Sequence, residues 1–427
     1  MSSADTPAIT LIHGAVQQYE WGKLGTSSIV AQLAHAAEFI TIEDNKPYAE
    51  LWLGTHSTAH SICPQHDNIT LKQHLNNNEL DYLFKILSIK KTLSIQAHPD
   101  KQLAQQLHTA NPGNYRDNQH KPEMAIAITQ FNSMCGFRSI QQITSYLRLV
   151  PELSDIIGHD NVQLFIANSN NSSEDSNRVQ LKHLFNVYMN VSQSILDQHI
   201  PKLIQRIKSL SNNIDNTGND AKTNNESPMI NLDAHSVVLQ LYSDFHHDIG
   251  ILCPYFLNCI QLQPGQALFL GPNLPHAYIS GDIVECMAQS DNVVRAGLTP
   301  KYRDINTLIN MLTYEMGHVQ QLIPQCIDTY TVRYAPDPDK YPEFALTHTT
   351  INESNIQSPY ELHAAGKHSI LLVYEGSGYI VSHTDTNKTK YKLSKGLSYL
   401  IHDGIDIDVV NECNNKLVVY RCSTNTK

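Results

Sequence analysis

The sequence has no long hydrophobic run and no cluster of basic residues. None of its apolar stretches approaches the roughly 20 residues that a membrane-spanning helix needs, and its 427 residues carry a formal net charge of −11 at pH 7. Proteins that bind nucleic acids usually present a basic patch, so we expect neither nucleic acid nor a membrane as a partner. An anionic small substrate would require local cations that overcome this acidic field.

The eight cysteines are scattered over the chain and form no CxxC pair. Isolated thiols in a chain of this length are typical of a reducing compartment rather than of a disulfide-stabilised secreted protein. Residues 1–7 contain neither the basic segment nor the apolar core of a signal peptide. We therefore expect a cytoplasmic protein, and we expect it to be a monomer.

Alternation between short-strand and helical patterns predicts several domains, which the chain length also favours. Short strands separated by turns occupy residues 1–140 and 232–320, and again residues 321–427. Between them, residues 141–231 show helical spacing with polar gaps. We expect a mainly β protein: one discontinuous β domain (1–140 and 232–320), a helical insert with polar linkers (141–231) and a C-terminal β domain (321–427).

Within the insert, apolar residues recur at helical spacing over residues 139–150 and 180–210. Pro201 interrupts the second stretch, so we expect two helices that meet there. Residues 168–177 and 211–228 are rich in Asn, Ser, Asp and Thr, which indicates loops. Further helices are expected at residues 26–39, 100–108 and 307–319, whereas residues 80–90 fit a helix or a strand equally well.

Residues 395–401 weakly repeat residues 264–270, because both pass from a glycine-containing turn into an apolar strand. The first copy leads on to His276, then to an expected turn at residues 280–282 and a strand at 283–287. The second copy has Gly404 where its loop should lead to a histidine. We expect a degenerate second β-sandwich that keeps the fold and lacks the site.

Residues 93–98 alternate strictly between apolar and polar side chains, as in a half-buried strand. Ser94, Gln96 and His98 should therefore project from one face, and Pro99 should end the strand. A glutamine and a histidine two residues apart could supply half of a metal site. They could equally be polar residues on a solvated face.

Residues 121–128 form a second alternating segment, in which Lys121 and Glu123 share a face with two alanines. A carboxylate on such a strand is expected to point inward. Its burial is costly unless it is paired or bound to a metal.

Together with His276, these segments offer two imidazoles, a carboxylate and an amide oxygen, which is a reasonable zinc set. The chain has 22 histidines, so spacing alone makes a chance grouping easy. Arg295, Lys301 and Lys121 would supply the positive field that a sugar phosphate needs. The alternative for Arg295 is a structural ion pair with Asp291, four residues earlier.

Several motifs together resemble type I phosphomannose isomerases. They comprise residues 93–101 (LSIQAHPDK), 118–124 (NQHKPEM) and 271–301, with further signatures at residues 19–22, 50–56 and 134–138. The resemblance covers most of residues 10–320, is weakest in the helical insert, and extends to the last hundred residues only in overall pattern. Gln119 is one departure, because the family often has Asn before His-Lys-Pro-Glu.

The resemblance implies a zinc aldose–ketose isomerase built from two cupin-like (jelly-roll) β-sandwich domains and an α-helical domain. The first β domain would then be catalytic. The family's ligands for one zinc per chain fall on Gln96, His98, Glu123 and His276, and its active-site arginine falls on Arg295.

The implied reaction interconverts mannose 6-phosphate and fructose 6-phosphate through a cis-enediol, with a proton moving between C1 and C2. We expect Arg295 to stabilise the enediolate or position the substrate, and Lys301 and Ser94 to lie near the phosphate. The candidate bases are His120, Lys121, Asp291 and a zinc-bound water.

Two other kinds of protein would share much of this site. A metal-binding cupin could sense a sugar phosphate without turning it over. A cupin oxygenase using iron would favour two histidines and one carboxylate with open positions, and Gln96 and the cations argue against it.

Overall fold

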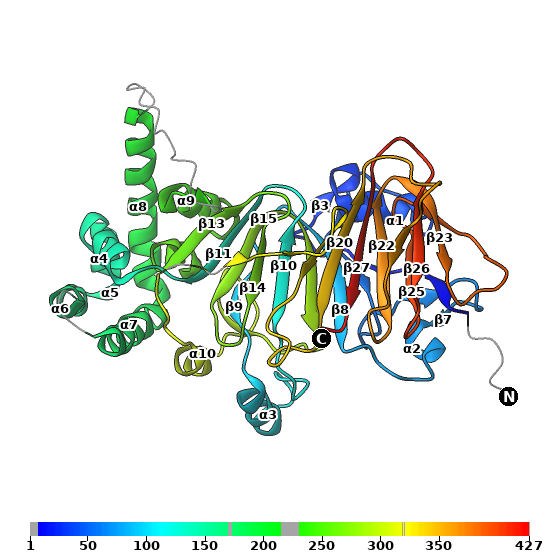
Figure 1. The fold of residues 1–427 in the computed structure, drawn as a ribbon. Coiled ribbons are helices and arrows are strands. Elements are labelled where there is room, and N and C mark those ends of the chain that lie inside the picture. Colours follow the sequence, from blue (N-terminus) through cyan, green and yellow to red (C-terminus); the bar gives the residue numbers. More distant parts are fainter. Residues whose placement is uncertain (1–6, 170–172, 215–229, 318, 320, 427) are drawn as a thin grey trace.

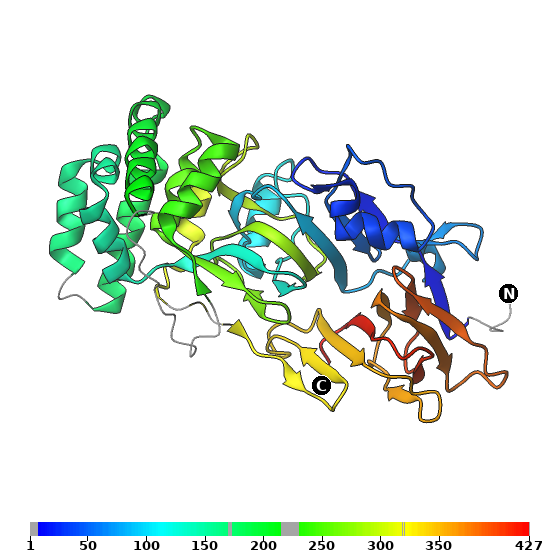
Figure 2. The same cartoon turned by 90° about the horizontal axis from the view of Figure 1, so that it is seen from above.

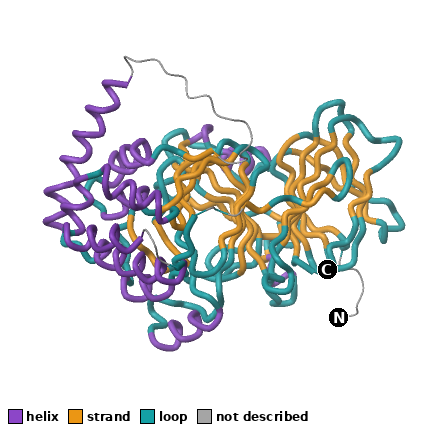
Figure 3. Tube along the Cα trace, turned by 60° about the vertical axis from the view of Figure 1, so that its left-hand side comes forward, coloured by secondary structure: helices purple, strands orange, loops and turns teal. Residues whose placement is uncertain are grey.

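Two groups of antiparallel strands and one group of helices lie side by side along the molecule (Figure 1). The computed structural model describes residues 7–169, 173–214, 230–317, 319 and 321–426. The helices between residues 140 and 245 gather at one end, farthest from the strands of the last hundred residues (Figures 1 and 2), and most of the helical segments lie together on one side in Figure 3 as well. The mainly β fold with a helical insert is therefore confirmed. No helix among the described residues has the length and apolar character needed to cross a membrane.

The central group is a single 12-stranded sheet whose strands form two sets, and β15 belongs to both. Its main path runs β12-β13-β11-β15-β10-β14-β17, and β15 also pairs with β8 and β9. Strand β5 continues from β8 to β2, and β16 pairs with β9. The bounds are β2 Ala15–Gln17, β5 Glu50–Leu53, β8 Tyr82–Ile89, β9 Ile95–Ala97, β10 Glu123–Ala127, β11 Phe131–Phe137, β12 Ile230–Asn231, β13 Leu257–Leu262, β14 Ala267–Leu270, β15 His276–Ala288, β16 Val294–Gly297 and β17 Gln321–Leu322.

Strand β15 is the long strand that pairs with both sets of strands in this sheet. Its first residues pair with β11 and β9, and its residues from Gly281 onward pair with β8 and β10. The expected turn at residues 280–282 is therefore wrong. The strand is continuous here, because pairing on both sides holds the neighbours of Gly281 extended. Gly281 itself has φ +121° and bends the strand.

The last hundred residues form a second sandwich. Its larger sheet has the order β1-β25-β22-β27-β20-β19-β18, and its smaller sheet has the order β21-β26-β23-β24. Strand β1 comes from the N-terminus and pairs with β25, although we expected residues 1–140 in the first β domain. The bounds are β1 Ile9–Ile12, β18 Gln325–Cys326, β19 Thr331–Tyr334, β20 Ala345–Ile351, β21 Tyr360–Leu362, β22 Ser369–Glu375, β23 Ser377–Ser382, β24 Tyr391–Ser394, β25 Ser398–Ile401, β26 Ile407–Asn411 and β27 Leu417–Ser423.

The two copies of the weak internal repeat adopt the same local structure. Gly265 has φ +85° and Gly396 has φ +88°, and a strand begins two residues after each glycine. The central sheet and the larger sheet of the second sandwich share one apolar core, to which Phe84, Ile126 and Leu372 contribute. The C-terminal sandwich is thus packed directly against the strands that carry the candidate site.

The helical insert differs from expectation in the place where its second helical stretch is interrupted. The break in residues 180–210 lies between α7 and α8, at residues 190–192, and Pro201 is inside α8. Pro201 is exposed, while Ile200, Leu203 and Ile207 are buried, so packing of the apolar stripe outweighs the one missing hydrogen bond. The bounds are α4 Ile140–Leu149, α5 Pro151–Ile157, α6 His159–Ser169, α7 Glu174–Met189, α8 Gln193–Ile214, α9 Ala234–Phe245 and η2 Ile249–Tyr255.

The polar segments and the remaining helices are shorter or longer than expected. Residues 168–169 and 174–177 are helical rather than loop, α8 continues through residue 214, and most of the expected loop 211–228 lies outside the described residues. The helix expected at 307–319 ends at Met311, and residues 80–90 prove to contain a strand. The other elements are η1 Gly25–Ser27, α1 Ile29–Ala36, α2 Leu71–His74, α3 Lys101–Ala110, α10 Ile305–Met311, β3 Lys23–Leu24, β4 Pro47–Tyr48, β6 Ile62–Cys63 and β7 Ile69–Thr70.

Gly281→Ala tests the bend in β15. An added Cβ would lie 2.5 Å from the carbonyl oxygen of Gln130 in a backbone conformation that L residues rarely adopt, so we expect a loss of stability of about 3 kcal/mol. Gly404→Ala is the matched control: φ is +68° but nothing lies within 4 Å, so it should cost about 1 kcal/mol. Urea unfolding followed by circular dichroism compares them, and equal midpoints would contradict a steric requirement at Gly281.

Candidate metal centre

His98, Glu123 and His276 come together from three different strands of the central sheet. His98 directly follows β9, Glu123 begins β10 and His276 begins β15. The Nε2 atom of His98 lies 3.4 Å from one carboxylate oxygen of Glu123, and Nε2 of His276 lies 3.5 Å from the other. All three side chains are buried, with exposed fractions of 0 to 3%. Their ligand atoms are close enough to share one ion.

The hydrogen bonds of these residues fit a metal. Nδ1 of His98 lies 2.7 Å from the carbonyl oxygen of Asn292, and Nδ1 of His276 lies 2.9 Å from that of Leu274. Each Nδ1 therefore carries the proton, and each Nε2 presents a lone pair to Glu123. These two Nε2 atoms and Oε2 of Glu123 are buried without a hydrogen-bond partner, which is costly unless a cation accepts them.

Electrostatics keep this donor set in the protonation state that a metal needs. Burial lowers the pKa of His98 to about 4, so its imidazole is neutral at neutral pH. Burial opposes ionisation of Glu123, but its surroundings, in which Lys121 supplies the positive charge, hold the pKa of its carboxyl well below the usual range. Lys121 Nζ lies 3.3 Å from Oε1 of Glu123. Two neutral imidazoles and a carboxylate are typical ligands of Zn²⁺.

Gln96 lies on β9 beside these residues. It is the register partner of His276 on one side and of Arg295 on the other. Ser94 and Gln96 share a face, as expected from the alternation, because the Ser94 hydroxyl donates to Oε1 of Gln96 over 3.2 Å. The amide oxygen of Gln96 is therefore a neutral oxygen donor on the strand that pairs with His276.

Asp117 organises the loop that orients His98. Its carboxylate accepts from the Ser290 hydroxyl at 2.8 Å, from the Asp291 amide at 2.8 Å and from Nδ2 of Asn292 at 3.1 Å. The carbonyl of Asn292 is thereby fixed against Nδ1 of His98. Partners of this kind set the orientation and tautomer of metal-binding histidines.

Arg295 is half-buried on β16, and no described carboxylate pairs with it. Burial lowers the pKa of Arg295, although a guanidinium remains charged at neutral pH. The alternative ion pair with Asp291 is wrong, because Asp291 lies instead 3.5 Å from Nε2 of His56. A half-buried cation without a partner is available to an anionic ligand.

The other expected site residues are less closely associated with the three ligands. Nε2 of His120 lies 2.7 Å from Oε1 of Glu343, a residue from the C-terminal part of the chain, and its ring stacks on Tyr341. Lys301 is exposed and has no ion pair among the described residues. Of the candidate bases, only Lys121 directly contacts a ligand residue.

Comparison with known proteins agrees with this geometry. Two family models, the catalytic domain and the helical insertion domain of type I phosphomannose isomerase, match residues 9–140 and 156–257. The mannose-6-phosphate isomerase of Saccharomyces cerevisiae is 38% identical over 427 residues, spanning 93% of this chain and 94% of that protein. The chain belongs to the type I phosphomannose isomerase family. The family inferred from the motifs is thus confirmed.

Other members of the family are similar over nearly the whole chain. The human mannose-6-phosphate isomerase is 36% identical, spanning 91% of this chain and 92% of its own length. The crystal structure of mannose 6-phosphate isomerase from Salmonella typhimurium, bound to its substrate and to zinc, has a TM-score of 0.75. It is 24% identical and covers 98% of this chain and 100% of its own, and at this identity the likeness shows the shared fold.

The structure also reveals a buried polar cluster that the sequence did not predict. Lys85 Nζ lies 3.1 Å from Glu285 and 3.5 Å from Glu50, Tyr278 donates to Glu285 over 2.9 Å, and Trp52 donates to Glu50. Burial alone would lower the pKa of Lys85, but the carboxylates of Glu50 and Glu285 raise it above its ordinary value, with a smaller contribution from Glu123. The cluster therefore lies close enough to Glu123 of the candidate metal centre to interact with it electrostatically.

A signal for this cluster was present in the sequence. Lys85 is the one charged residue in β8, whose eight residues are all buried, and Glu285 is the one charged residue between Ile283 and Ala288. A lone charge in a fully apolar strand indicates a buried ionic partner. The partner itself depends on the register of β8 against β15, which places Lys85 opposite Glu285.

Asp117→Ala tests the support of His98. Loss of these hydrogen bonds should release the Asn292 carbonyl and weaken Zn²⁺ binding about 10- to 100-fold, measured by competition with a chromophoric chelator. Asp328→Ala is the matched control, because Asp328 accepts from the Tyr330 and Thr331 amides far along the chain, in the C-terminal sandwich. An affinity of Asp117→Ala equal to that of the control would show that the loop does not orient the ligand.

Proposed function

We propose that this protein is a zinc-dependent aldose–ketose isomerase that interconverts mannose 6-phosphate and fructose 6-phosphate. The observation that carries the proposal is the buried, unpartnered donor set of His98, Glu123 and His276, which lies beside the unpaired guanidinium of Arg295. The names of the family members are consistent with it. A single zinc ion per chain, a cytoplasmic location and a monomeric state remain predictions.

Gln96, His98, Glu123 and His276 would hold the metal. Because Glu123 is the only anionic ligand in this set, the centre would keep a net positive charge, which a glutamate at position 96 would largely cancel. When bound, Zn²⁺ would polarise the substrate's carbonyl and hydroxyl oxygens.

The cations around the site suit a sugar phosphate. Arg295 is adjacent in register to Gln96, so we assign it to the oxygen that becomes negative as the enediolate forms. Lys301 lies farther along the same loop and is exposed, and we assign it, with Ser94, to the phosphate end of the substrate.

The isomerisation requires one residue to carry a proton between two adjacent carbons. A base removes the proton from C2 of the open-chain aldose, the electrons move into the C1–C2 bond and onto O1, and O1 takes up a proton to give the cis-enediol. Return of the proton to C1, with loss of the O2 proton, gives the ketose, so no oxidant or reductant is consumed. We assign this role to Lys121, because His120 is bound to Glu343 and Asp291 faces His56. A lysine accepts a proton only in its uncharged form, which a Zn²⁺ ion bound beside it would favour.

A metal-binding protein that senses a sugar phosphate without turnover is the second candidate. The same cations would serve it, so turnover decides between the two. A coupled assay for fructose 6-phosphate should show isomerase activity that a chelator abolishes and Zn²⁺ restores. Binding of mannose 6-phosphate without product would favour the sensor, and turnover that survives complete metal removal would contradict the metal's role.

Arg295→Ala tests the assignment of the unpaired cation. Removing one group that stabilises a developing negative charge typically costs about 10²- to 10³-fold in kcat, and the zinc content should stay unchanged because Arg295 is not a proposed ligand. Arg178→Ala is the control, because that arginine pairs with Glu174 on the surface of α7. Steady-state kinetics with metal analysis gives both quantities, and unchanged turnover in Arg295→Ala would refute the assignment.

A further inference from the structure

One carboxylate next to the helical insert makes the hydrogen bonds to the loop that follows Arg295, beside apolar and backbone contacts between the two segments. Asp248 lies immediately before η2, and its Oδ1 accepts the backbone amides of Gly250 and of Leu298, both at 2.7 Å. Its Oδ2 accepts the amide of Thr299 at 3.3 Å. Two of the three donors thus belong to the segment that leads from Arg295 to Lys301.

The backbone on both sides of this contact leaves no room for side chains. A Cβ on Gly250 would lie 2.8 Å from the Leu298 nitrogen, and a Cβ on Gly297 would lie 2.8 Å from Cα of Gly250. Leu298 itself has φ +57°, an uncommon conformation for a non-glycine residue. Such a conformation persists where surrounding contacts over-determine it, and the Asp248 carboxylate supplies two of those contacts.

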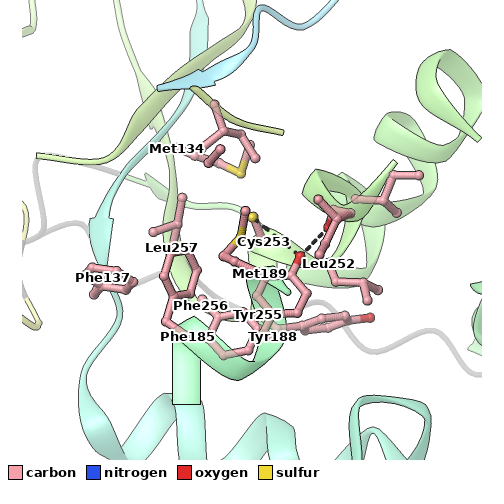
Figure 4. Close-up of a cluster of buried hydrophobic side chains, with 14 of the residues drawn as sticks. Met134, Phe137, Phe185, Tyr188, Met189, Leu252, Cys253, Tyr255, Phe256 and Leu257 are labelled. Carbon is pink, nitrogen blue, oxygen red and sulfur yellow. Dashed lines mark hydrogen bonds between the residues drawn. The ribbon is translucent and has the colours of Figure 1, made fainter. Parts of the chain in front are cut away.

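The segment that carries Asp248 is itself held by the helical core. Tyr188 on α7 donates to the carbonyl of Ile249, and its hydroxyl lies 3.6 Å from Sγ of Cys253. Figure 4 shows Tyr188 among the aromatic side chains of Phe185, Phe256 and Tyr255 in this cluster. Asp248 is therefore presented from a rigid part of the insert.

We propose that Asp248 is a positioning residue for the substrate-binding loop, and that the helical insert thereby sets the placement of Arg295 and Lys301. The carboxylate fixes Leu298 and Thr299, and the Thr299 hydroxyl in turn accepts the amide of Lys301 at 3.0 Å. Arg295 precedes the anchored residues in the chain and is the register partner of Gln96. This inference rests on the proposed function for its effect on turnover, whereas the anchoring itself does not.

The test compares three variants of the full-length zinc enzyme. Asp248→Ala removes all three hydrogen bonds and should lower kcat/KM for mannose 6-phosphate about 10- to 100-fold, through a higher KM as Lys301 shifts and a lower kcat as Arg295 shifts, while zinc content is retained. Asp248→Asn keeps an Oδ1 acceptor for both short bonds, so it should stay within about threefold of the wild type. Asp233→Ala removes a comparable cap, because Asp233 accepts the Ser236 amide at the start of α9, and it should leave KM unchanged.

A second readout does not depend on turnover. Hydrogen exchange of the Leu298 and Thr299 amides should be slow in the wild type and in Asp248→Asn, and at least about tenfold faster in Asp248→Ala. If Asp248→Ala does not fold, Gly250→Ala perturbs the same contact, because its Cβ would lie 2.8 Å from the Leu298 nitrogen, and it should also raise KM. Kinetics and exchange in Asp248→Ala equal to those of Asp233→Ala would overturn the proposal, as would an equal defect in Asp248→Asn. A wild type without isomerase activity would refute the proposed function while the exchange data still tested the anchor.

Discussion

The structure depends on a buried carboxylate whose neighbours cannot satisfy it by themselves. Glu123 lies at the end of an interior strand, with an imidazole 3.4 to 3.5 Å from each of its oxygens and Lys121 at 3.3 Å. Both imidazoles donate from Nδ1 to backbone carbonyls, so their Nε2 atoms have lone pairs and no proton to offer. A divalent cation resolves this excess of buried acceptors, and the surrounding strands and loops hold the acceptors where one ion can reach them.

The bent strand β15 makes this concentration of polar groups possible. It begins at His276, passes Tyr278, bends at Gly281 and continues to Glu285, so it contributes to the ligand set and to the buried Lys85 cluster. The C-terminal sandwich packs against the same sheet and sends Glu343 to His120. The helical insert supports the opposite edge of the site, where β16 and the following loop meet η2. The two β domains and the helical insert therefore all contribute residues or contacts to the candidate metal centre and its surroundings.

The sequence was most informative where a chemical requirement lies within a few residues. Alternation at residues 93–98 placed Ser94 and Gln96 on one face, and a carboxylate among alanines identified Glu123 as inward-pointing. Spacing alone offered His276 as a partner only among many chance groupings, because the other candidates are more than 150 residues away, and the family resemblance selected it. Ser280-Gly281-Asp282 has the local composition of a turn, yet strand pairing makes it a bend. Pro201 likewise carries a helix-breaking signal that the packing of α8 overrides. Contacts such as that of Asp248 with Leu298 depend on tertiary placement, and no local sequence pattern predicts them.

The most direct test of the account is the anomalous scattering of crystals of the full-length protein, measured on both sides of the zinc absorption edge. We expect one strong peak, bonded at about 2.0–2.2 Å by Nε2 of His98, Nε2 of His276, the carboxylate of Glu123 and Oε1 of Gln96. A water molecule at that position, or a zinc ion bound only elsewhere on the chain, would contradict the claim that these buried acceptors exist to hold a metal.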